Sequence, residues 1–417
     1  MIRMKLRWFL SGVVREATEM CKQVAKLVDA QRDLLSPQAI SGLDAAYAET
    51  QEAIRNRADK ETLRKSMGKL EVAADKWLRP YPNAKWRENI EVFLVAIAVA
   101  MAIRTFFLQP FKIPTGSMQP TLYGIEFEPM QATPEKPAEE IPGFLGRVWD
   151  AAVRGTFYHF VQAESAGELA RGDPPQKFLA FFNKQTVWLK YDGRNELTPH
   201  QIWFAPDPEQ GSNQETKFLA RAGLQPGLTF NGGDYVFRIK EVAGDHLFVD
   251  RVAYNFRAPT RGEIIVFKTK GITHPNMPQD QFYIKRLVAL GGEKVSIGDD
   301  HHIRINDVRL DAATPHFGNV YTFGPDWKEN HFFGHANDKV AREHLHYSIA
   351  PYFPDERTDY TVPEKHFMVM GDNTLRSFDS RGWGPFPRDN VIGKSFFVYW
   401  PIANHRESRF GWAHTTK

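Results

Sequence analysis

The chain has 417 residues, enough for two or three globular units, and its 42% hydrophobic and 25% charged residues exclude wholesale disorder. Its formal net charge of only +3, with no localised basic stripe, argues against a nucleic-acid-binding protein. The single cysteine, Cys21, excludes an intrachain disulfide.

Residues 1–88 are predicted to form a helical region. Apolar residues recur at helical spacing from residue 8 to residue 34, and charged residues fill the intervals. Ser-Pro at 36–37 and the proline-rich stretch at 79–82 interrupt the pattern. The basic, amphipathic segment 1–14 suits a helix on a membrane surface, and it equally suits one half of a helical hairpin.

The only long apolar stretch follows. Residues 92–103 are uninterrupted apolar, and extending the run to residue 108 gives 17 residues, the lower limit for a membrane-spanning helix. Glu91 and Arg104 lie near its two ends, where long charged side chains reach the headgroups. The stretch starts too late to be a removable signal peptide. We predict one permanent transmembrane helix at 89–108; the alternative is a buried helix of a globular domain.

The charges around this stretch predict its orientation. Residues 1–91 contain 17 Lys and Arg against 13 Asp and Glu, whereas the first basic residues beyond Arg104 are Lys112 and Lys136. Because basic residues collect on the cytoplasmic side of a membrane, we expect the N-terminus inside and residues 109–417 outside.

Residues 109–417 have the texture of a mostly antiparallel β domain. Short β-branched and aromatic runs alternate with Gly, Asp, Asn and Pro, as is typical of strands separated by turns. These runs occupy residues 235–237, 247–249, 264–267, 294–297, 303–305, 367–370 and 396–400.

The block 113–122, with the sequence Ile-Pro-Thr-Gly-Ser-Met-Gln-Pro-Thr-Leu, places Ser117 nine residues beyond the predicted span. Pro114 and Pro120 favour extended backbone, and Gly116 lets another segment approach the serine closely. Taken alone, such a Thr-Gly-Ser turn is also typical of a solvated loop.

This block resembles the serine signature of the bacterial type I signal peptidases. Two further blocks resemble the same family in the same order: Tyr283–Glu293, which is similar to the block with the family's catalytic lysine, and Gly371–Gly384, which is similar to its Gly-Asp-Asn…Ser-x-Asp-Ser-Arg block. A fourth stretch, 244–267, resembles the strand block between them. Together these stretches comprise 59 of the 417 residues.

The resemblance implies a mainly β fold, in which a curved antiparallel β-sheet catalytic domain of signal-peptidase type follows the helical region and one transmembrane helix. Two stretches, about 124–243 and 313–362, are predicted to be insertions relative to the family. The first is too aromatic for a disordered linker, so we expect an additional β-rich lobe there, with a loop at 129–142.

The resemblance implies that Ser117 is the nucleophile and Lys285 its general base. A serine hydroxyl needs a base to become nucleophilic, and none of the three blocks contains a histidine. A lysine can act as base only when neutral, and an apolar environment lowers its pKa. Since successive strand residues point to opposite faces, one of Lys285 and Arg286 can be buried while the other meets water.

The remaining site residues are also implied by the resemblance. Thr115 is expected to donate its hydroxyl to the oxyanion together with the backbone N–H of Ser117. Ser377 is expected to hydrogen-bond the lysine and orient it. The supporting residues are expected to be Asp379 and Arg381, which brace the loop, and Gly371, Asp372 and Asn373, which form its turn. Gly291-Gly292-Glu293 departs from the family's usual Gly-x-Pro-Gly-Asp, which leaves the geometry of this turn open.

A metal site is the alternative use of the histidines at 331, 335, 344 and 346, whose spacings a metal could use. Neither an acidic nor a cysteine partner completes a recognisable set, and the family needs no metal. We therefore expect no metal and no other cofactor.

The predicted function is a serine endopeptidase, anchored in the bacterial inner membrane with its catalytic domain outside the cytoplasm. Its expected partners are the lipid bilayer and the signal peptides of exported preproteins, which it would cleave after Ala-x-Ala-like residues. Nucleic acid is not an expected partner. One alternative is a Ser/Lys peptidase with a dedicated substrate in plasmid transfer or pilin processing; another is a non-catalytic membrane-anchored binding protein.

Overall fold

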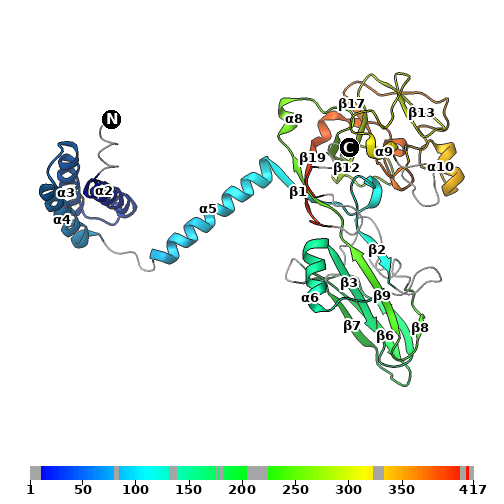
Figure 1. Ribbon diagram of the computed structural model, residues 1–417, viewed down its shortest axis with the longest axis horizontal. Helices are drawn as coiled ribbons and strands as arrows, with labels where there is room; N and C mark the ends of the chain where they lie inside the picture. The colour runs from blue at the N-terminus through cyan, green and yellow to red at the C-terminus, as the bar shows by residue number, and fades with distance from the viewer. Residues whose placement is uncertain are drawn as a thin grey trace. The chain divides into compact units, whose positions relative to one another are not determined.

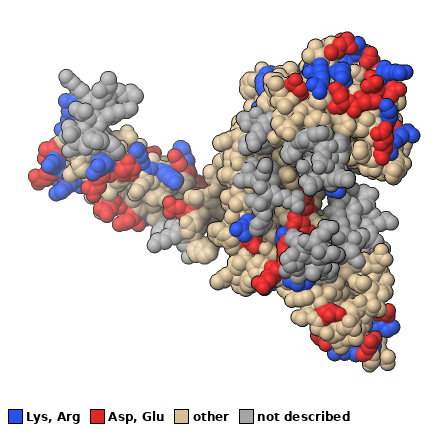
Figure 2. Space-filling model, turned by 45° about the vertical axis from the view of Figure 1, so that its right-hand side comes forward, with Lys and Arg blue, Asp and Glu red and all other residues tan. Residues whose placement is uncertain are grey.

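The computed structural model describes residues 11–78, 84–130, 139–174, 176–178, 182–203, 224–322, 333–403 and 410–412. Most of the amphipathic segment at 1–14, the stretch 79–82, the middle of the loop predicted at 129–142, and His331 lie outside the described residues. The chain divides into two compact units, Met1–Ala98 and Val99–Lys417 (Figure 1). On the face in Figure 2, mixed basic and acidic side chains cover much of the first unit, whereas the second shows wide uncharged areas.

Three helices pack together in the first unit. They are α2 (Gly12–Gln31), α3 (Pro37–Arg55) and α4 (Lys60–Trp77). The Ser36 side chain caps α3 by accepting a hydrogen bond from the backbone N–H of Ala39, 3.2 Å away. Leu43 and Leu70 are fully buried between the helices, beside Cys21. The predicted helical region therefore has an apolar core of its own.

Helix α5 (Ala84–Phe106) contains the apolar stretch. Residues Glu88–Phe106 are long and apolar enough to cross a membrane, and none of this segment is buried in the structure. It is the only such helix among the described residues. Because water disfavours an apolar helix surface that is exposed all round, the bilayer is the environment that suits it.

A curled antiparallel sheet of seven strands forms the centre of the second unit (Figure 1). In spatial order its strands are β1 (Leu108–Lys112), β10 (His246–Asp250), β19 (Val391–Trp400), β11 (Ile264–Lys268), β12 (Phe282–Ala289), β17 (His366–Met370) and β18 (Phe386–Pro387). The fully buried side chains of Leu247 and Val249 alternate with outward-facing residues of β10, as expected for a half-buried strand. The predicted fold class, a curved antiparallel β domain, is confirmed.

A second, four-stranded sheet packs beside the first. Its order is β15 (Val308–Arg309), β14 (Ile303–Ile305), β13 (Lys294–Ile297) and β16 (Tyr360–Thr361). Helices α9 (Gly318–Tyr321) and α10 (Asp338–Leu345) lie in the connection between β15 and β16. The departure at Gly291-Gly292-Glu293 forms a tight turn between β12 and β13, in which Gly292 has φ +85° and Glu293 N–H donates to Leu290 O.

Strands β2 to β9 form a lobe of two further sheets. The first has the order β2 (Glu126–Pro129), β9 (Tyr235–Val242) and β3 (Thr156–Gln162). The second consists of β5 (Gln176–Phe178), β6 (Phe182–Tyr191), β4 (Gly167–Gly172) and β8 (Thr229–Phe230), with β7 (Thr198–Trp203) paired to β6. Both sheets contribute to one apolar core, in which Leu169, Leu189 and Phe237 are buried.

A short helix precedes β3 in this lobe. Helix α6 (Phe144–Trp149) continues into a π-helical turn, η2 (Asp150–Arg154). The other short helices of the second unit are η1 (Gly116–Met118), α8 (Ala253–Phe256), η3 (Thr374–Arg376), α11 (Ser380–Trp383) and η4 (Arg388–Asn390).

Candidate active site

Ser117 lies in the loop that joins β1 to the lobe. The backbone is extended at Thr115 and then makes the single 3₁₀ turn η1, which contains Ser117. A Cβ on Gly124 would clash with the Thr115 backbone, so only glycine lets the returning chain pass this closely behind the serine. Ser117 itself is buried, as is the neighbouring Met118. The loop is therefore a packed, fixed element and not a solvated turn.

Lys285 reaches this serine from β12. Its Nζ lies 2.6 Å from Ser117 Oγ, although 168 residues separate the two in the chain. On β12, Lys285 pairs with Ile265 of β11, and only 5% of its surface is exposed. Burial lowers the pKa of Lys285 to about 8, even though the carboxylates of Asp379 and Asp372 favour the charged form. A substantial fraction of this amine is therefore neutral at mildly alkaline pH.

Thr115 brings a second hydroxyl to the serine. Its Oγ1 lies 3.4 Å from Ser117 Oγ, at the far limit of a hydrogen bond. The side chain therefore lies on the nucleophile's side of the loop, where it can reach an oxygen that forms beside Ser117 Oγ.

The segment that follows β17 fixes the serine loop from the other side. The backbone N–H of Asn373 donates to Ser117 O at 3.1 Å, and its Nδ2 donates to Gly116 O at 3.0 Å. A Cβ on Gly371 would clash with Ser377 Oγ and with Ser117 O. This turn is thus in direct contact with the backbone of Ser117.

Asp379 and Arg381 form a fully buried ion pair in the same segment. Arg381 Nη2 lies 2.8 Å from Asp379 Oδ2, and the guanidinium also donates to Thr374 and to Ala336 O. Burial alone would raise the pKa of Asp379, but Arg381, the hydroxyl of Ser377 and the N–H of Gly371 outweigh it and hold this pKa below its usual value. The pair links the loop after β17 to the segment before α10.

The structure buries both Lys285 and Arg286, since Arg286 is only 1% exposed and does not meet water. Its Nε and Nη2 donate to the two oxygens of Asp372 at 2.7 and 2.5 Å, and further hydrogen bonds go to the carbonyls of Gly262 and His316. Thr121 donates to the same carboxylate at 2.5 Å. Strand β12 is covered on both faces at this point, and the paired charge makes burial of the arginine tolerable. Asp372 therefore contributes a buried ion pair as well as a turn.

We expect Arg286→Ala to destabilise the protein by about 3–5 kcal/mol, because it leaves the Asp372 carboxylate buried and unpaired. Equilibrium chemical unfolding measures this change. The double variant Arg286→Met, Asp372→Leu should recover a large part of the loss. Lys190→Ala, which breaks the exposed pair with Glu168, is the matched control and should leave the unfolding curve almost unchanged. A loss in the double variant equal to that of Arg286→Ala would contradict this explanation.

Ser377 differs from its expected geometry. Its Oγ is buried in the site, but it makes no hydrogen bond to Lys285 among the described residues. Its hydroxyl lies close to Gly371 and helps to lower the pKa of Asp379. Its predicted role in orienting the lysine stays a prediction.

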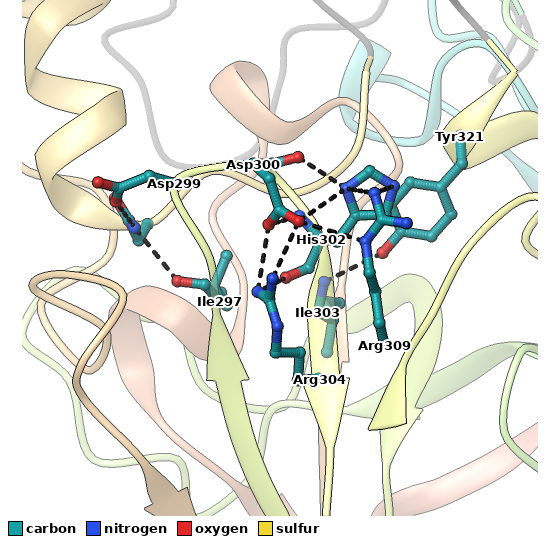
Figure 3. A network of polar contacts seen from close by, with 9 residues as sticks. Ile297, Asp299, Asp300, His302, Ile303, Arg304, Arg309 and Tyr321 are labelled. Atoms are coloured by element: carbon teal, nitrogen blue, oxygen red, sulfur yellow. Dashed lines mark hydrogen bonds and ion pairs between the residues drawn. The ribbon is translucent and has the colours of Figure 1, made fainter. Parts of the chain in front are cut away.

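The histidines lie away from the dyad's hydrogen bonds. His302 stacks on Tyr321 at 4.6 Å, and Arg309 donates to its ring while Asp300 pairs with Arg304 (Figure 3). This network ties β14 to the segment that contains α9. In the part of the chain that the structure describes, three or more His, Cys, Asp or Glu side chains are nowhere grouped to hold a metal ion.

Sequence reasoning missed Arg286 and Thr121. Both contact Asp372, and through it they connect β12, the serine loop and the segment after β17. The available signal was an arginine directly after the lysine in a predicted core strand, together with an aspartate in the last block.

Comparison with known proteins identifies the same regions. The family model described as "Signal peptidase, peptidase S26" matches residues 86–135 and 240–400. The probable signal peptidase I-2 of Synechocystis is 26% identical over 45% of this chain and 64% of its own length. Signal peptidase I of Rickettsia prowazekii is 35% identical, and the probable thylakoidal processing peptidase 2 of Arabidopsis thaliana 34%. These matches cover 37% and 38% of this chain, and 56% and 34% of those proteins.

The matched part of the chain therefore spans less than two thirds of these three relatives. A crystal structure of a signal peptidase I from Enterococcus faecalis is 25% identical, with a TM-score of 0.20, over 33% of this chain and 97% of that one. The family model leaves out residues 136–239, which contain α6 and most of the lobe.

Proposed function

Because this chain belongs to the S26 family of signal peptidases, we propose that it is a membrane-anchored serine endopeptidase that removes signal peptides from exported preproteins. The observation that carries the proposal is the 2.6 Å contact between Lys285 Nζ and Ser117 Oγ. A buried lysine with a lowered pKa beside a serine hydroxyl is the arrangement that a Ser/Lys peptidase needs.

The reaction follows from this geometry. Neutral Lys285 takes the proton from Ser117 Oγ as that oxygen attacks the scissile carbonyl carbon. The oxyanion that forms accepts hydrogen bonds from the Thr115 hydroxyl and the Ser117 backbone N–H. The C–N bond then breaks, and the ammonium of Lys285 protonates the departing amine. In the second half, Lys285 deprotonates a water that attacks the ester, and the Ser117 hydroxyl is restored with release of the signal peptide.

The supporting residues hold the Ser117 hydroxyl and the Lys285 amine in position. Asn373 holds the Ser117 backbone, and the pair of Asp379 and Arg381 holds the segment in which Asn373 lies. We propose that Ser377 orients Lys285, because the buried hydroxyl of Ser377 lies in the same segment as Asn373 and Asp379. The substrate would bind as an added strand along the extended backbone before Ser117, with small side-chain pockets selecting Ala-x-Ala.

Cleavage of a preprotein tests the proposal. The detergent-solubilised full chain is incubated with a preprotein that carries an Ala-x-Ala site, and mass spectrometry identifies the new N-terminus. We expect a single cut directly after the second alanine. An intact preprotein, with the peptidase shown to be folded, would count against the proposal.

We place the anchor at residues 89–108 in a bacterial inner membrane, with the N-terminus in the cytoplasm and the catalytic domain outside it. The apolar, exposed surface of α5 supports the anchor, and the excess of basic residues before it supports the orientation.

A reporter that is active only in the cytoplasm should therefore be silent when it is fused after Lys417. The same reporter fused after Leu78, before the apolar helix, should be active and serves as the control. A bright signal from the C-terminal fusion would refute the orientation, whatever the result for cleavage.

A peptidase with a dedicated substrate is the second candidate, and the lobe outside the family model favours it. Depleting the protein in cells and identifying the exported proteins that keep their signal peptides separates the two. Many uncleaved preproteins indicate a general signal peptidase, whereas one or two indicate a dedicated enzyme.

A further inference from the structure

Helix α6 presents an apolar surface to solvent. Phe144, Leu145, Val148 and Trp149 are 71%, 81%, 50% and 60% exposed. These residues are two i, i+4 pairs, so they form one continuous stripe on a helix of six residues. The opposite side of the helix faces the lobe, where the Arg147 guanidinium lies over the Phe160 ring of β3.

The helix is held rigidly in this orientation. Asp150, directly after it, is buried and accepts hydrogen bonds from Tyr158 at 2.7 Å and from Arg154 at 2.9 Å. Its apolar stripe is therefore not a frayed end that can fold back into the core. In water, these side chains forgo the favourable free energy that burial of their exposed apolar surface would provide.

The end of β19 is hydrogen-bonded to the turn after α6. Trp400 Nε1 donates to Ala152 O at 2.8 Å, and the backbone N–H of Ile402 donates to Val153 O at 2.9 Å. Strand β19 pairs with β10, and β10 pairs with β1, which begins two residues after α5 ends. Since neighbouring strands are about 4.8 Å apart, β19 lies only about 10 Å from β1 across the sheet.

The sheet surface between these points is aromatic on its outer face. Phe248 of β10 pairs with Phe397 of β19, and its ring lies 4.5 Å from that of Tyr399. All three are half-buried, and they lie on the face opposite the fully buried Leu247. An aromatic surface thus extends from the strand after α5 towards α6.

We propose that the apolar stripe of α6 inserts into the lipid–water interface of the membrane and acts as a second contact of the peptidase domain with the bilayer. The inference rests on the membrane anchoring proposed above. The tryptophan, phenylalanine and leucine of the stripe suit the headgroup–acyl boundary. A lipid surface fits better than a second copy of the chain, because a stripe of four side chains is much smaller than the roughly 20–30 residues per partner of a stable protein interface.

This placement requires that the sheet of β1, β10 and β19 lies along the membrane surface on its aromatic face. Residues 136–239, outside the family model, would then add a chain-specific support that limits how far the catalytic domain can tilt on its anchor.

Fluorescence quenching in lipid nanodiscs tests the proposal with the full chain. In a Cys21→Ser background, Leu145→Cys carries an environment-sensitive fluorophore, and Val308→Cys on β15, where valine is 66% exposed, is the matched control. The nanodiscs contain phosphatidylcholine and phosphatidylglycerol, with or without a lipid that bears a nitroxide near its headgroup. Iodide serves as the aqueous quencher.

We expect the nitroxide lipid to quench the label at position 145 several-fold more than the label at 308, and iodide to show the reverse order. Equal behaviour of the two labels would overturn the inference, because the stripe would then be in water. Protection of position 145 from both quenchers would overturn it too, since a protein surface would then cover the stripe. Co-elution of the protein with the nanodiscs reports the anchor separately, so a chain that fails to co-elute refutes the anchoring itself.

Discussion

Ser117→Ala and Lys285→Ala will each abolish peptide-bond cleavage while leaving the protein folded and membrane-bound. We expect each to reduce kcat/KM by at least about 10³-fold, because in the proposed mechanism the hydroxyl is the attacking group and the amine that is hydrogen-bonded to it is the base. The double variant should be little worse than either single variant, since the two groups act as a unit. Cleavage rates of a preprotein, with circular dichroism as the check on folding, measure the effect.

Two further variants distinguish a base from a mere positive charge. Lys285→Arg should be as inactive as Lys285→Ala, because a guanidinium stays protonated and cannot accept the proton of Ser117. Lys268→Ala removes an exposed lysine of the neighbouring strand β11 and should retain full activity. Substantial activity of Lys285→Arg would show that the base is another group.

Activity should also rise with pH through the titration of Lys285. Burial lowers its pKa to about 8, against about 10.4 for a free lysine, and only the neutral amine accepts a proton. The neutral fraction, and with it kcat/KM, should therefore increase about tenfold between about pH 7 and pH 9. A pH–rate profile on a peptide with alanine at both recognition positions measures the acidic limb, which reports the free enzyme.

Histidine is the competing explanation of such a limb. Burial lowers the pKa of His246 to about 4 and lowers those of His301 and His302, so none of them should titrate near pH 8. Replacing all three should leave the limb in place. Disappearance of the limb with any one histidine would mean a Ser-His enzyme, and the proposed mechanism would have to be abandoned.

The sequence was most informative about the candidate catalytic residues, because these residues lie in short blocks that can be compared with a family. Ser117 and Lys285 each lie in a block that resembles the family's, and the structure brings their side chains together. The strand pattern also predicted the β domain, because alternation of apolar residues is a local property of the chain.

What the sequence did not show depends on contacts between distant segments. The burial of Arg286 follows from Asp372, which lies 86 residues away, and no local pattern reports such a partner. The same holds for α6, where the sequence Phe-Leu-Gly-Arg-Val-Trp does not reveal which side faces the lobe. The alternation of side chains along a strand therefore did not predict the burial of Arg286. At this point β12 is covered on both faces, so the charged side chains on both faces are buried.

The dependence of Ser117 on Asn373 has a consequence for the biogenesis of the enzyme. The nucleophile is among the first residues to follow the membrane helix, but its base emerges 168 residues later and the turn that holds its backbone lies later still. A nascent chain leaves the ribosome at about 5–20 residues per second, so for many seconds the serine is present without a partner. With the dyad and topology proposed above, proteolytic activity thus arises only after most of the polypeptide has been synthesised. In the proposed mechanism, the order of the residues along the chain therefore delays the assembly of the site.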